Sequence, residues 1–225
     1  MIKFENTQTT GWAAAIRGMR NPLNSWDKSD SKFTDFCELA DYVGPNDLDL
    51  MKRLIKAGSD HSKFMRMINV TVDITAPMYW WKEFDTYKVG TVRNSCSTMH
   101  TIHKRPFTID DFSHEKLFNM KDDNNLPDNI AYLCNGIIAM NTIVSLLNSF
   151  RENYLVTKDK KYWYSIIQLL PSSYNQRATV QLNYQVLRNI YKSDRRHHKL
   201  DEWRVYFMEW INGLPYSDLI TMEVE

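Results

Sequence analysis

The side chains in this chain that could do chemistry on their own are a few cysteines, histidines and basic residues. Cys96 could act as a nucleophile, but no His-Asp partner set lies near it in sequence, so we expect it to be a small buried hydrophobic residue. Four histidines could suggest a metal, yet their spacing fits no compact ligand motif. They are His61, His100, His103 and His114. The basic run from Arg195 to Lys199 is typical of a solvated turn. We therefore expect no metal site, and these residues alone assign no catalytic residue.

One central stretch predicts the elements that position the polar residues in its neighbourhood. Apolar and polar residues alternate from Val70 to Thr75, the pattern of a strand with one buried face, and Pro77 prevents the ladder from continuing. An aromatic-rich helix follows, runs to Lys88 and ends at Gly90. Its paired tryptophans are expected to pack in the core or a subunit interface. Residues from Thr86 to Thr98 then lie at a helix end and in a loop, where sites are usually built.

Helical periods recur along the rest of the chain. One helix is expected from Leu48 to Ile55, and a long helix, apolar over most of its girth, from Ile130 to Leu147. Two more helices are marked by apolar residues between Leu182 and Tyr191 and from about Lys199 to Gly213. The polar stretch over residues 101–129 is predicted to be a surface excursion. Helices grouped beside a sheet, without one-for-one alternation with its strands, indicate the α+β class.

Length and composition limit the kind of protein. The 225 residues allow one domain over 1–225, without a recognisable linker or repeat. Lys and Arg total 28 and Asp and Glu total 27, so no net charge favours nucleic acid or a membrane surface as partner. Three scattered cysteines predict neither a disulfide framework nor a zinc site. No apolar stretch is long enough to span a membrane, and we expect a soluble cytoplasmic protein.

Three segments of the chain resemble the flavin-dependent thymidylate synthases. The run Val70-Thr71-x-x-Ile74-x-Ala76-Pro77 is similar to the strand and Ala-Pro of that family. In the same frame, the family's Arg-His-Arg falls on residues 86–88 and its Ser falls on Cys96. A His-containing stretch before the strand corresponds to residues 61–66. After Leu170-Pro171, the family's Asn, Arg, Arg, His and Glu correspond to five residues here. They are Asn183, Gln185, Asp194, His198 and Glu202.

The resemblance implies a fold, a cofactor and an assembly. The expected fold is α+β, with a central mostly antiparallel sheet and flanking helices. The expected cofactor is flavin adenine dinucleotide, FAD, for which Lys88 would supply a cation and Tyr87 a ring or hydroxyl. The residues at the family's flavin positions form the cofactor-binding prediction. They are Ser62, Thr86, Tyr87, Lys88, Asn183, Gln185 and His198. Because the family assembles its flavin sites from several subunits, a homotetramer is also expected.

The resemblance implies a substrate site that has lost charge. Residues at the family's deoxyuridylate positions form the substrate-binding prediction. They are Glu83, Asn94, Cys96, Ser97, Thr98 and Asp194, with Ile167 at one further arginine position. Three arginines that would neutralise a phosphate are thus replaced by Thr98, Ile167 and Asp194, and the last would repel it. Arginines beside these positions could form a relocated phosphate clamp. They are Arg93, Arg177, Arg195 and Arg196.

The predicted function follows from this family frame. It is a flavin-assisted one-carbon transfer to C5 of a uracil nucleotide such as dUMP, with NADPH and methylenetetrahydrofolate implied as co-substrates. No protein nucleophile is required in that chemistry. Two alternatives stay open: a flavoenzyme that modifies a different pyrimidine nucleotide, for example by hydroxymethylation, or a non-catalytic homologue kept as a binding or assembly module.

Overall fold

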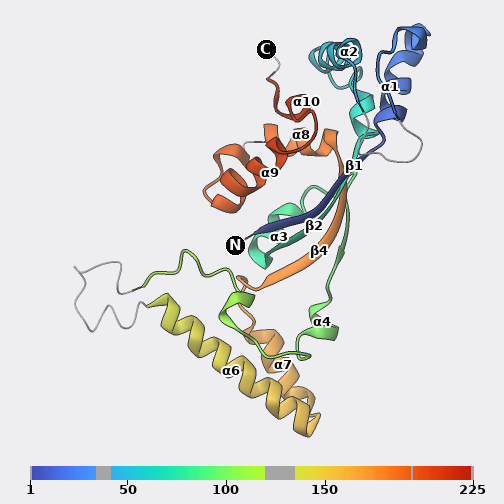
Figure 1. Ribbon diagram of the computed structural model, residues 1–225. Helices are drawn as coiled ribbons and strands as arrows, with labels where there is room; N and C mark the ends of the chain where they lie inside the picture. Colours follow the sequence, from blue (N-terminus) through green and yellow to red (C-terminus); the bar gives the residue numbers. More distant parts are fainter. Residues whose placement is uncertain (1, 34–41, 120–134, 194, 224–225) are drawn as a thin grey trace. The chain divides into compact units, whose positions relative to one another are not determined.

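The structure is a computed structural model that describes residues 2–33, 42–119, 135–193 and 195–223 (Figure 1). Two compact units share the chain. Unit 1 comprises Met1–Lys3, Thr75–Phe84 and Ser95–Ala178, and unit 2 comprises Phe4–Ile74, Asp85–Asn94 and Thr179–Glu225. The single domain expected over residues 1–225 stays a prediction. Within the described ranges, no helix combines the length and apolar character needed to cross a membrane.

Four strands form one mostly antiparallel sheet in the order β1-β2-β4-β3. They are β1 Lys3–Thr10, β2 Asn69–Pro77, β3 Val92–Ser95 and β4 Asn175–Asn183. In β2 the residues at alternate positions from Val70 to Ala76 are fully buried, while the polar residues between them are half-exposed. In β4, Ala178, Val180 and Leu182 are buried in the same way. The period of two thus gives the sheet one apolar and one polar face.

Helices make up most of the remaining described chain. The α-helices are α1 Trp12–Arg20, α2 Pro45–Lys56, α3 Met78–Phe84, α4 Thr98–Thr101, α6 Gly136–Thr157, α7 Lys160–Leu169, α8 Tyr184–Lys192, α9 Met208–Asn212 and α10 Asp218–Thr221. Short 3-10 turns are Asn21–Leu23, Trp26–Lys28, Lys63–Arg66, Ile109–Asp111 and Arg195–His197, and Glu202–Phe207 is π-helical. The predicted α+β class with helices flanking a sheet is confirmed.

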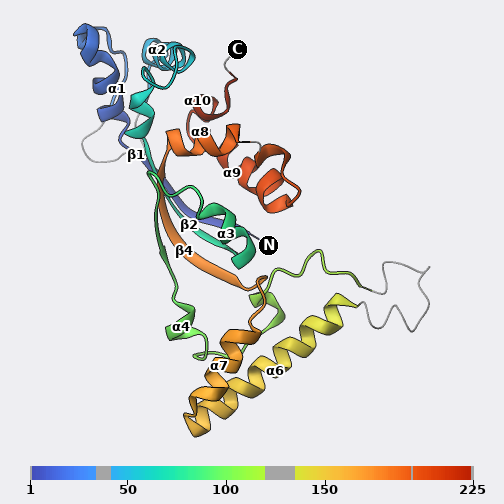
Figure 2. The same ribbon diagram turned by 180° about the vertical axis from the view of Figure 1, so that it is seen from behind.

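Unit 1 is built on the helical hairpin α6–α7, whose helices lie side by side in both views (Figures 1 and 2). Its core is an apolar cluster of fully buried side chains. They are Ile102, Phe107, Phe112, Met140, Leu147 and Ile166. Three of them come from the first half of residues 101–129, so that part of the predicted surface excursion also contributes to the core. Its alternation of apolar residues with prolines and charges hid this burial. Residues 120–134 lie outside the described residues.

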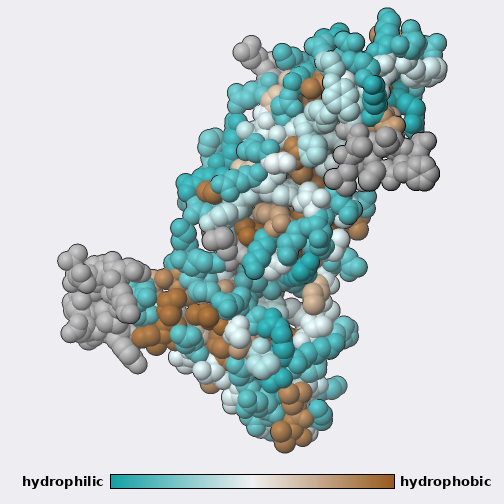
Figure 3. Space-filling view, viewed as in Figure 1, coloured by the Kyte–Doolittle hydropathy of each residue, from teal (hydrophilic) through white to brown (hydrophobic). Residues whose placement is uncertain are grey.

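Helix α6 is apolar around most of its circumference, as expected. Met140 and Leu147 are buried, whereas Ile138, Leu146 and Val156 are exposed. The space-filling view shows apolar surface at both ends of this helix (Figure 3). The helix begins at Gly136, where Asn135 Oδ1 accepts a hydrogen bond from the backbone N–H of Ile138 at 3.0 Å. The predicted start at Ile130 lies outside the described residues.

Unit 2 packs α1 against the Lys63–Arg66 turn and α8 against α10. Gly11 makes the first contact possible, because it joins β1 to α1 at φ 89° and a Cβ there would meet the carbonyl oxygen of Met67 at 2.1 Å. The Trp12 ring stands edge-on to Tyr184 with centroids 5.3 Å apart. Since the buried Ser62 directly precedes the Lys63–Arg66 turn, this packing fixes the position of one predicted cofactor residue.

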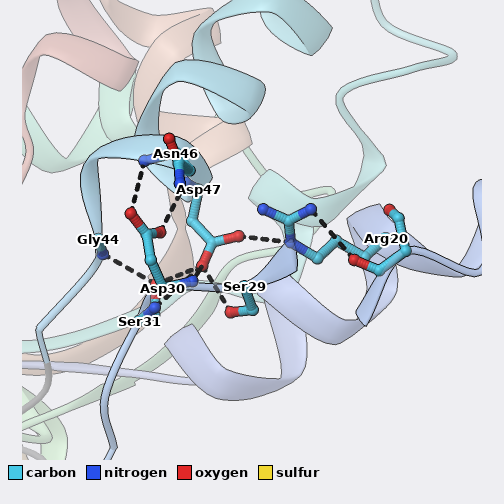
Figure 4. A network of polar contacts seen from close by, with 8 residues as sticks. Arg20, Ser29, Asp30, Ser31, Gly44, Asn46 and Asp47 are labelled. Atoms are coloured by element: carbon cyan, nitrogen blue, oxygen red, sulfur yellow. Dashed lines mark hydrogen bonds and ion pairs between the residues drawn. The ribbon is translucent and has the colours of Figure 1, made fainter. Parts of the chain in front are cut away.

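A buried polar network joins α1 to α2 in unit 2 (Figure 4). One Asp47 carboxylate oxygen accepts from Arg20 Nε at 2.6 Å, and the other accepts from the hydroxyls of Ser29 and Ser31, each at 2.6 Å. Asp30 accepts from two backbone N–H groups in the first turn of α2, at 2.9 and 3.1 Å. Burial opposes ionisation of Asp47, but these hydrogen bonds and the Arg20 charge outweigh it, so its pKa lies below the ordinary value.

Two predicted element boundaries are wrong. Helix α3 ends at Phe84 and does not reach Lys88, because the next residue, Asp85, turns to pair with Arg93. Leu182 belongs to β4, where it continues the alternation of the strand, and the helix starts only at Tyr184. The helix expected from Lys199 to Gly213 is present as the π-helical turn and α9 together.

Candidate functional site

Tyr87 lies at the centre of a polar and aromatic cluster in unit 2. Its hydroxyl accepts a hydrogen bond from Arg195 Nε at 2.8 Å and shares another with Ser193 Oγ at 2.9 Å. The Arg195 guanidinium lies 5.0 Å from the ring centroid of Trp203 and 5.7 Å from that of Tyr87. A half-buried arginine held between two rings is a fixed cation, which suits the recognition of a phosphate.

His198 lies against the same tryptophan. The ring centroids of His198 and Trp203 are 6.3 Å apart. The ring centroids of Tyr87 and Trp203 are 6.4 Å apart. The backbone N–H of Leu200 donates to His198 Nδ1 at 3.1 Å, so Nδ1 is an acceptor and the neutral ring carries its proton on Nε2. Trp203 and Arg195 thus bring together two of the predicted cofactor residues, Tyr87 and His198. The sequence alone indicated neither Trp203 nor Arg195 as a cofactor-binding residue.

Asn183 connects β4 to α8. Its Oδ1 caps the helix by accepting from the backbone N–H of Val186 at 3.1 Å, which leaves the amide nitrogen as the group suited to a ligand. A Cβ on Gly90, which has φ 79°, would approach that nitrogen and a methyl group of Val186 to 3.1 Å each. Because Gly90 has no side chain, its backbone can pass close to the predicted cofactor residue Asn183.

The other predicted cofactor residues make local contacts. Gln185 Nε2 donates to Asn189 Oδ1 at 2.9 Å along α8, Ser62 is buried, and Thr86 and Lys88 are exposed. All seven predicted cofactor residues belong to unit 2. Their role in binding a flavin stays a prediction.

Unit 1 contains a cavity of about 640 Å³ that includes part of the predicted substrate site. Cys96 and Thr98 line it, together with basic, acidic and aromatic residues from all three chain segments of unit 1. Other polar residues in its lining include Lys3, Thr75, Thr101, Lys104, Arg105, Asp110, Asp111, Glu115, Tyr174, Asn175, Gln176 and Arg177. A volume of this size is within the usual range for small-molecule sites.

Cys96 is exposed, so the expectation of a buried cysteine is wrong. It directly follows β3, which is an edge strand in the sheet of the described residues. Its backbone N–H donates to the carbonyl of Arg177 at 2.8 Å, and its carbonyl accepts from Gln176 Nε2 at 2.9 Å. The thiol lies 3.6 Å from Thr101 Oγ1. The backbone of Cys96 is thus anchored to β4 on both sides, while the residue stays exposed.

The remaining predicted substrate residues are dispersed. Ser97 Oγ accepts from the backbone N–H of His100 at 3.4 Å and so caps the short helix α4. Glu83 is half-buried on α3, Asn94 is exposed on β3, and neither is among the residues that line the cavity. Ile167 packs against the apolar cluster of unit 1. Asp194 lies outside the described residues.

An ion pair dominates one wall of the cavity. Arg105 donates through both terminal nitrogens to the two carboxylate oxygens of Asp111, one of them at 2.9 Å. Asp111 also accepts from the backbone N–H of Thr108 at 2.8 Å. Burial, followed by the nearby Asp111 charge, raises the pKa of Tyr174, so this phenol stays neutral and able to donate.

The arginines that could replace the lost phosphate contacts differ in their partners. Arg93 NH1 donates to both oxygens of Asp85 at 2.9 and 2.8 Å, and Arg196 pairs with Glu223 at 2.9 Å. Arg195 is held by Tyr87 as described above. Arg177 lines the cavity, on the strand that anchors Cys96.

Comparison with solved structures identifies the fold. Thymidylate synthase X from Helicobacter pylori, solved with FAD and dUMP, overlaps 99% of this chain and 96% of its own with a TM-score of 0.62 and 14% identity. The UMP/dUMP methylase PolB from Streptomyces cacaoi, bound with 5-Br UMP, overlaps 98% of this chain and 94% of its own with a TM-score of 0.59 and 11% identity. This chain has the thymidylate synthase X fold.

The predicted resemblance is thereby confirmed at the level of fold. No protein-family model matches the chain, and no curated protein matches it either. At 11 and 14% identity the likeness determines the backbone and leaves the reaction open.

Proposed function

We propose that this chain is a flavin-dependent enzyme that modifies C5 of the uracil ring of a pyrimidine nucleotide. The observation that carries the proposal is the near-complete overlap with two proteins solved with uracil nucleotides, one of them with FAD as well. The overlap includes almost all of each neighbour, so no large part of their fold is lost here. Fold alone does not define a reaction, and the residues of the candidate site therefore have to fit the ligands.

The Tyr87 cluster fits a flavin nucleotide in its chemistry. Arg195 offers a cation held between two rings, His198 offers a ring N–H, and Asn183 offers an amide nitrogen beside the close backbone at Gly90. These are donors suited to a pyrophosphate and to the polar edge of a flavin. A bound flavin would supply hydride chemistry, and the protein would bind and orient it. Arg195 would thus take the role of a cation that Thr86 and Tyr87 no longer supply.

The finer reaction belongs to the same proposal. It is transfer of a one-carbon group to C5, with methylenetetrahydrofolate as donor and NADPH as reductant. Hydroxymethylation of a different pyrimidine nucleotide is the related alternative, because it would keep the flavin residues and change the substrate residues. A homotetramer and a cytoplasmic location, both expected from the sequence, stay predictions.

A second candidate, a non-catalytic binding or assembly module, is favoured by one observation. Ile167, at a position where the family has an arginine, packs against the apolar cluster of unit 1. Core packing at this position supports the loss of a phosphate contact there, as expected if a substrate site decays while the fold is kept. The module would bind no flavin.

Flavin titration separates these two candidates. The chain should quench FAD fluorescence and shift its absorption, and His198→Ala should weaken binding about tenfold because a charge-assisted or aromatic contact is lost. His197→Ala is the matched control, since that neighbouring histidine is exposed. If FAD neither co-purifies nor responds, the enzyme proposal fails and the module is supported.

A further inference from the structure

Three basic side chains of the unit 1 cavity have no role in the site described above. Lys3 begins β1, Arg177 lies on β4, and Lys104 follows α4. They come from the start, the middle and the last third of the chain, yet all line the same cavity. The sequence prediction included Arg177 as one possible clamp residue and gave no role to the two lysines.

The charges of the cavity favour an anion. Its wall has four basic residues, the three above and Arg105, and three acidic ones, Asp110, Asp111 and Glu115. Arg105 and Asp111 neutralise each other through their paired hydrogen bonds. Glu115 accepts from the hydroxyl of its neighbour Ser113 at 3.0 Å. Among the residues that the structure describes, no carboxylate lies within ion-pair distance of Lys3 or Lys104, so two ammonium groups stay available.

Neutral groups in the same wall suit a sugar and a base. Thr75 and Thr98 contribute hydroxyls, and Tyr174 contributes an aromatic ring with a neutral phenol. Asn175 Oδ1 is buried and, within the described part of the chain, has no hydrogen-bond partner. A buried amide oxygen without a donor is uncommon, and a ring N–H such as N3–H of uracil would satisfy it after a rotation of the amide.

We propose that this cavity binds a pyrimidine nucleoside monophosphate and that Lys3, Lys104 and Arg177 hold its phosphate. The inference rests on the proposed function and names the groups that replace the three lost family arginines. Lysine binds phosphate as a point charge from any direction, so a clamp of two lysines and one arginine does not need the forked geometry of three guanidinium groups. The thiol of Cys96 and the hydroxyl of Thr98 lie in the same wall, where bound nucleotide would cover them.

Cys96 provides a direct reporter of occupancy, because it is exposed and lines the cavity. The rate of Cys96 alkylation by N-ethylmaleimide would be measured by peptide mass spectrometry at increasing UMP, dUMP, uridine and inorganic phosphate. UMP or dUMP should slow the alkylation at micromolar concentration, phosphate only at millimolar concentration, and uridine far less than UMP. Equal protection by uridine and UMP would overturn the assignment of the phosphate.

Charge-removing variants test two of the three residues, Lys104 and Arg177, directly. Lys104→Gln and Arg177→Gln should each raise the UMP concentration for half-protection about tenfold or more. Lys160→Gln is the matched control, because this lysine is exposed on α7 in the same unit and does not line the cavity. Circular dichroism and the midpoint of thermal unfolding would check that each variant is folded. If UMP protects Cys96 in folded Lys104→Gln and Arg177→Gln at the same concentration as in the control variant, the clamp is refuted.

Flavin titration on the same preparations separates failure of the clamp from failure of the proposed function. FAD binding with no protection of Cys96 by nucleotide would overturn the cavity assignment and leave the flavoenzyme proposal standing. Protection of Cys96 that depends on Lys104 and Arg177, without FAD binding, would support the nucleotide site and overturn the flavoenzyme proposal.

Discussion

Replacement of Asp47 by Asn should destabilise the chain strongly. Asp47 is fully buried and its partner Arg20 is 5% exposed, so the variant leaves a buried guanidinium without a counter-charge. Breaking a buried pair from one side costs about 3–5 kcal/mol. For a protein of this length, each kcal/mol lowers the unfolding midpoint by about 2–4 °C, so a fall of about 6–20 °C is expected. Thermal and urea unfolding followed by circular dichroism would measure it.

The same helix offers a matched control for this prediction. Asp49→Asn removes the exposed i,i+4 pair with Arg53, in which both side chains are about two-thirds exposed, and should cost about 0.5 kcal/mol or less. Because the pKa of Asp47 is lowered in the folded state, its stabilisation is present above the unfolded value of about 3.9 and is lost as pH falls through the folded value. The gap between wild type and Asp47→Asn should therefore narrow below about pH 4. Equal stability of the two variants at pH 7 would refute the reasoning.

Three further predictions concern the site and the assembly. Ile167→Arg should lower the free energy of unfolding by about 1–3 kcal/mol without restoring nucleotide binding, because Ile167 packs on the apolar cluster. Thr98→Arg, in the cavity wall, should tighten UMP binding. Calorimetry that shows tighter UMP binding by Ile167→Arg than by Thr98→Arg would contradict this. Gly90→Ala should weaken FAD binding in titration more than Gly58→Ala, because both have positive φ but only Gly90 would crowd Asn183; equal effects would count against a flavin beside Asn183. Light scattering should give a tetramer that Leu146→Glu on α6 dissociates, and a stable wild-type monomer at micromolar concentration would disprove the assembly.

The sheet was predictable only where burial imposes a period. Residues 70–76 alternate between apolar and polar types, and β2 was predicted for that reason. β4 alternates equally from Ala178 to Leu182, but its last leucine also fits the helical period of α8, so the sequence pattern favours a helix there. β1 has few apolar residues besides Phe4 because most of it is exposed, so its sequence contains no hydrophobic pattern to detect.

The candidate site was predictable residue by residue but not as an arrangement. Tyr87 and His198 could be named from the family frame, whereas their common contact with Trp203 and the binding of Arg195 to Tyr87 depend on the tertiary fold. Cys96 is exposed because it follows β3, an edge strand. The edge position of β3 can be known only from the order of the strands in the sheet, which the sequence does not reveal. The roles of Lys3 and Lys104 likewise depend on a cavity formed by segments far apart in sequence.

We propose that this chain carries out flavin-dependent chemistry at C5 of a uracil nucleotide. Release of tritium from [5-³H]dUMP and [5-³H]UMP tests it most directly, because replacement of the hydrogen at C5 releases the label whichever carbon group is added. With FAD, NADPH and methylenetetrahydrofolate, we expect release from at least one nucleotide that disappears when FAD is omitted and falls in His198→Ala but not in His197→Ala. Binding of FAD and nucleotide without any release of tritium from either substrate would contradict the claim.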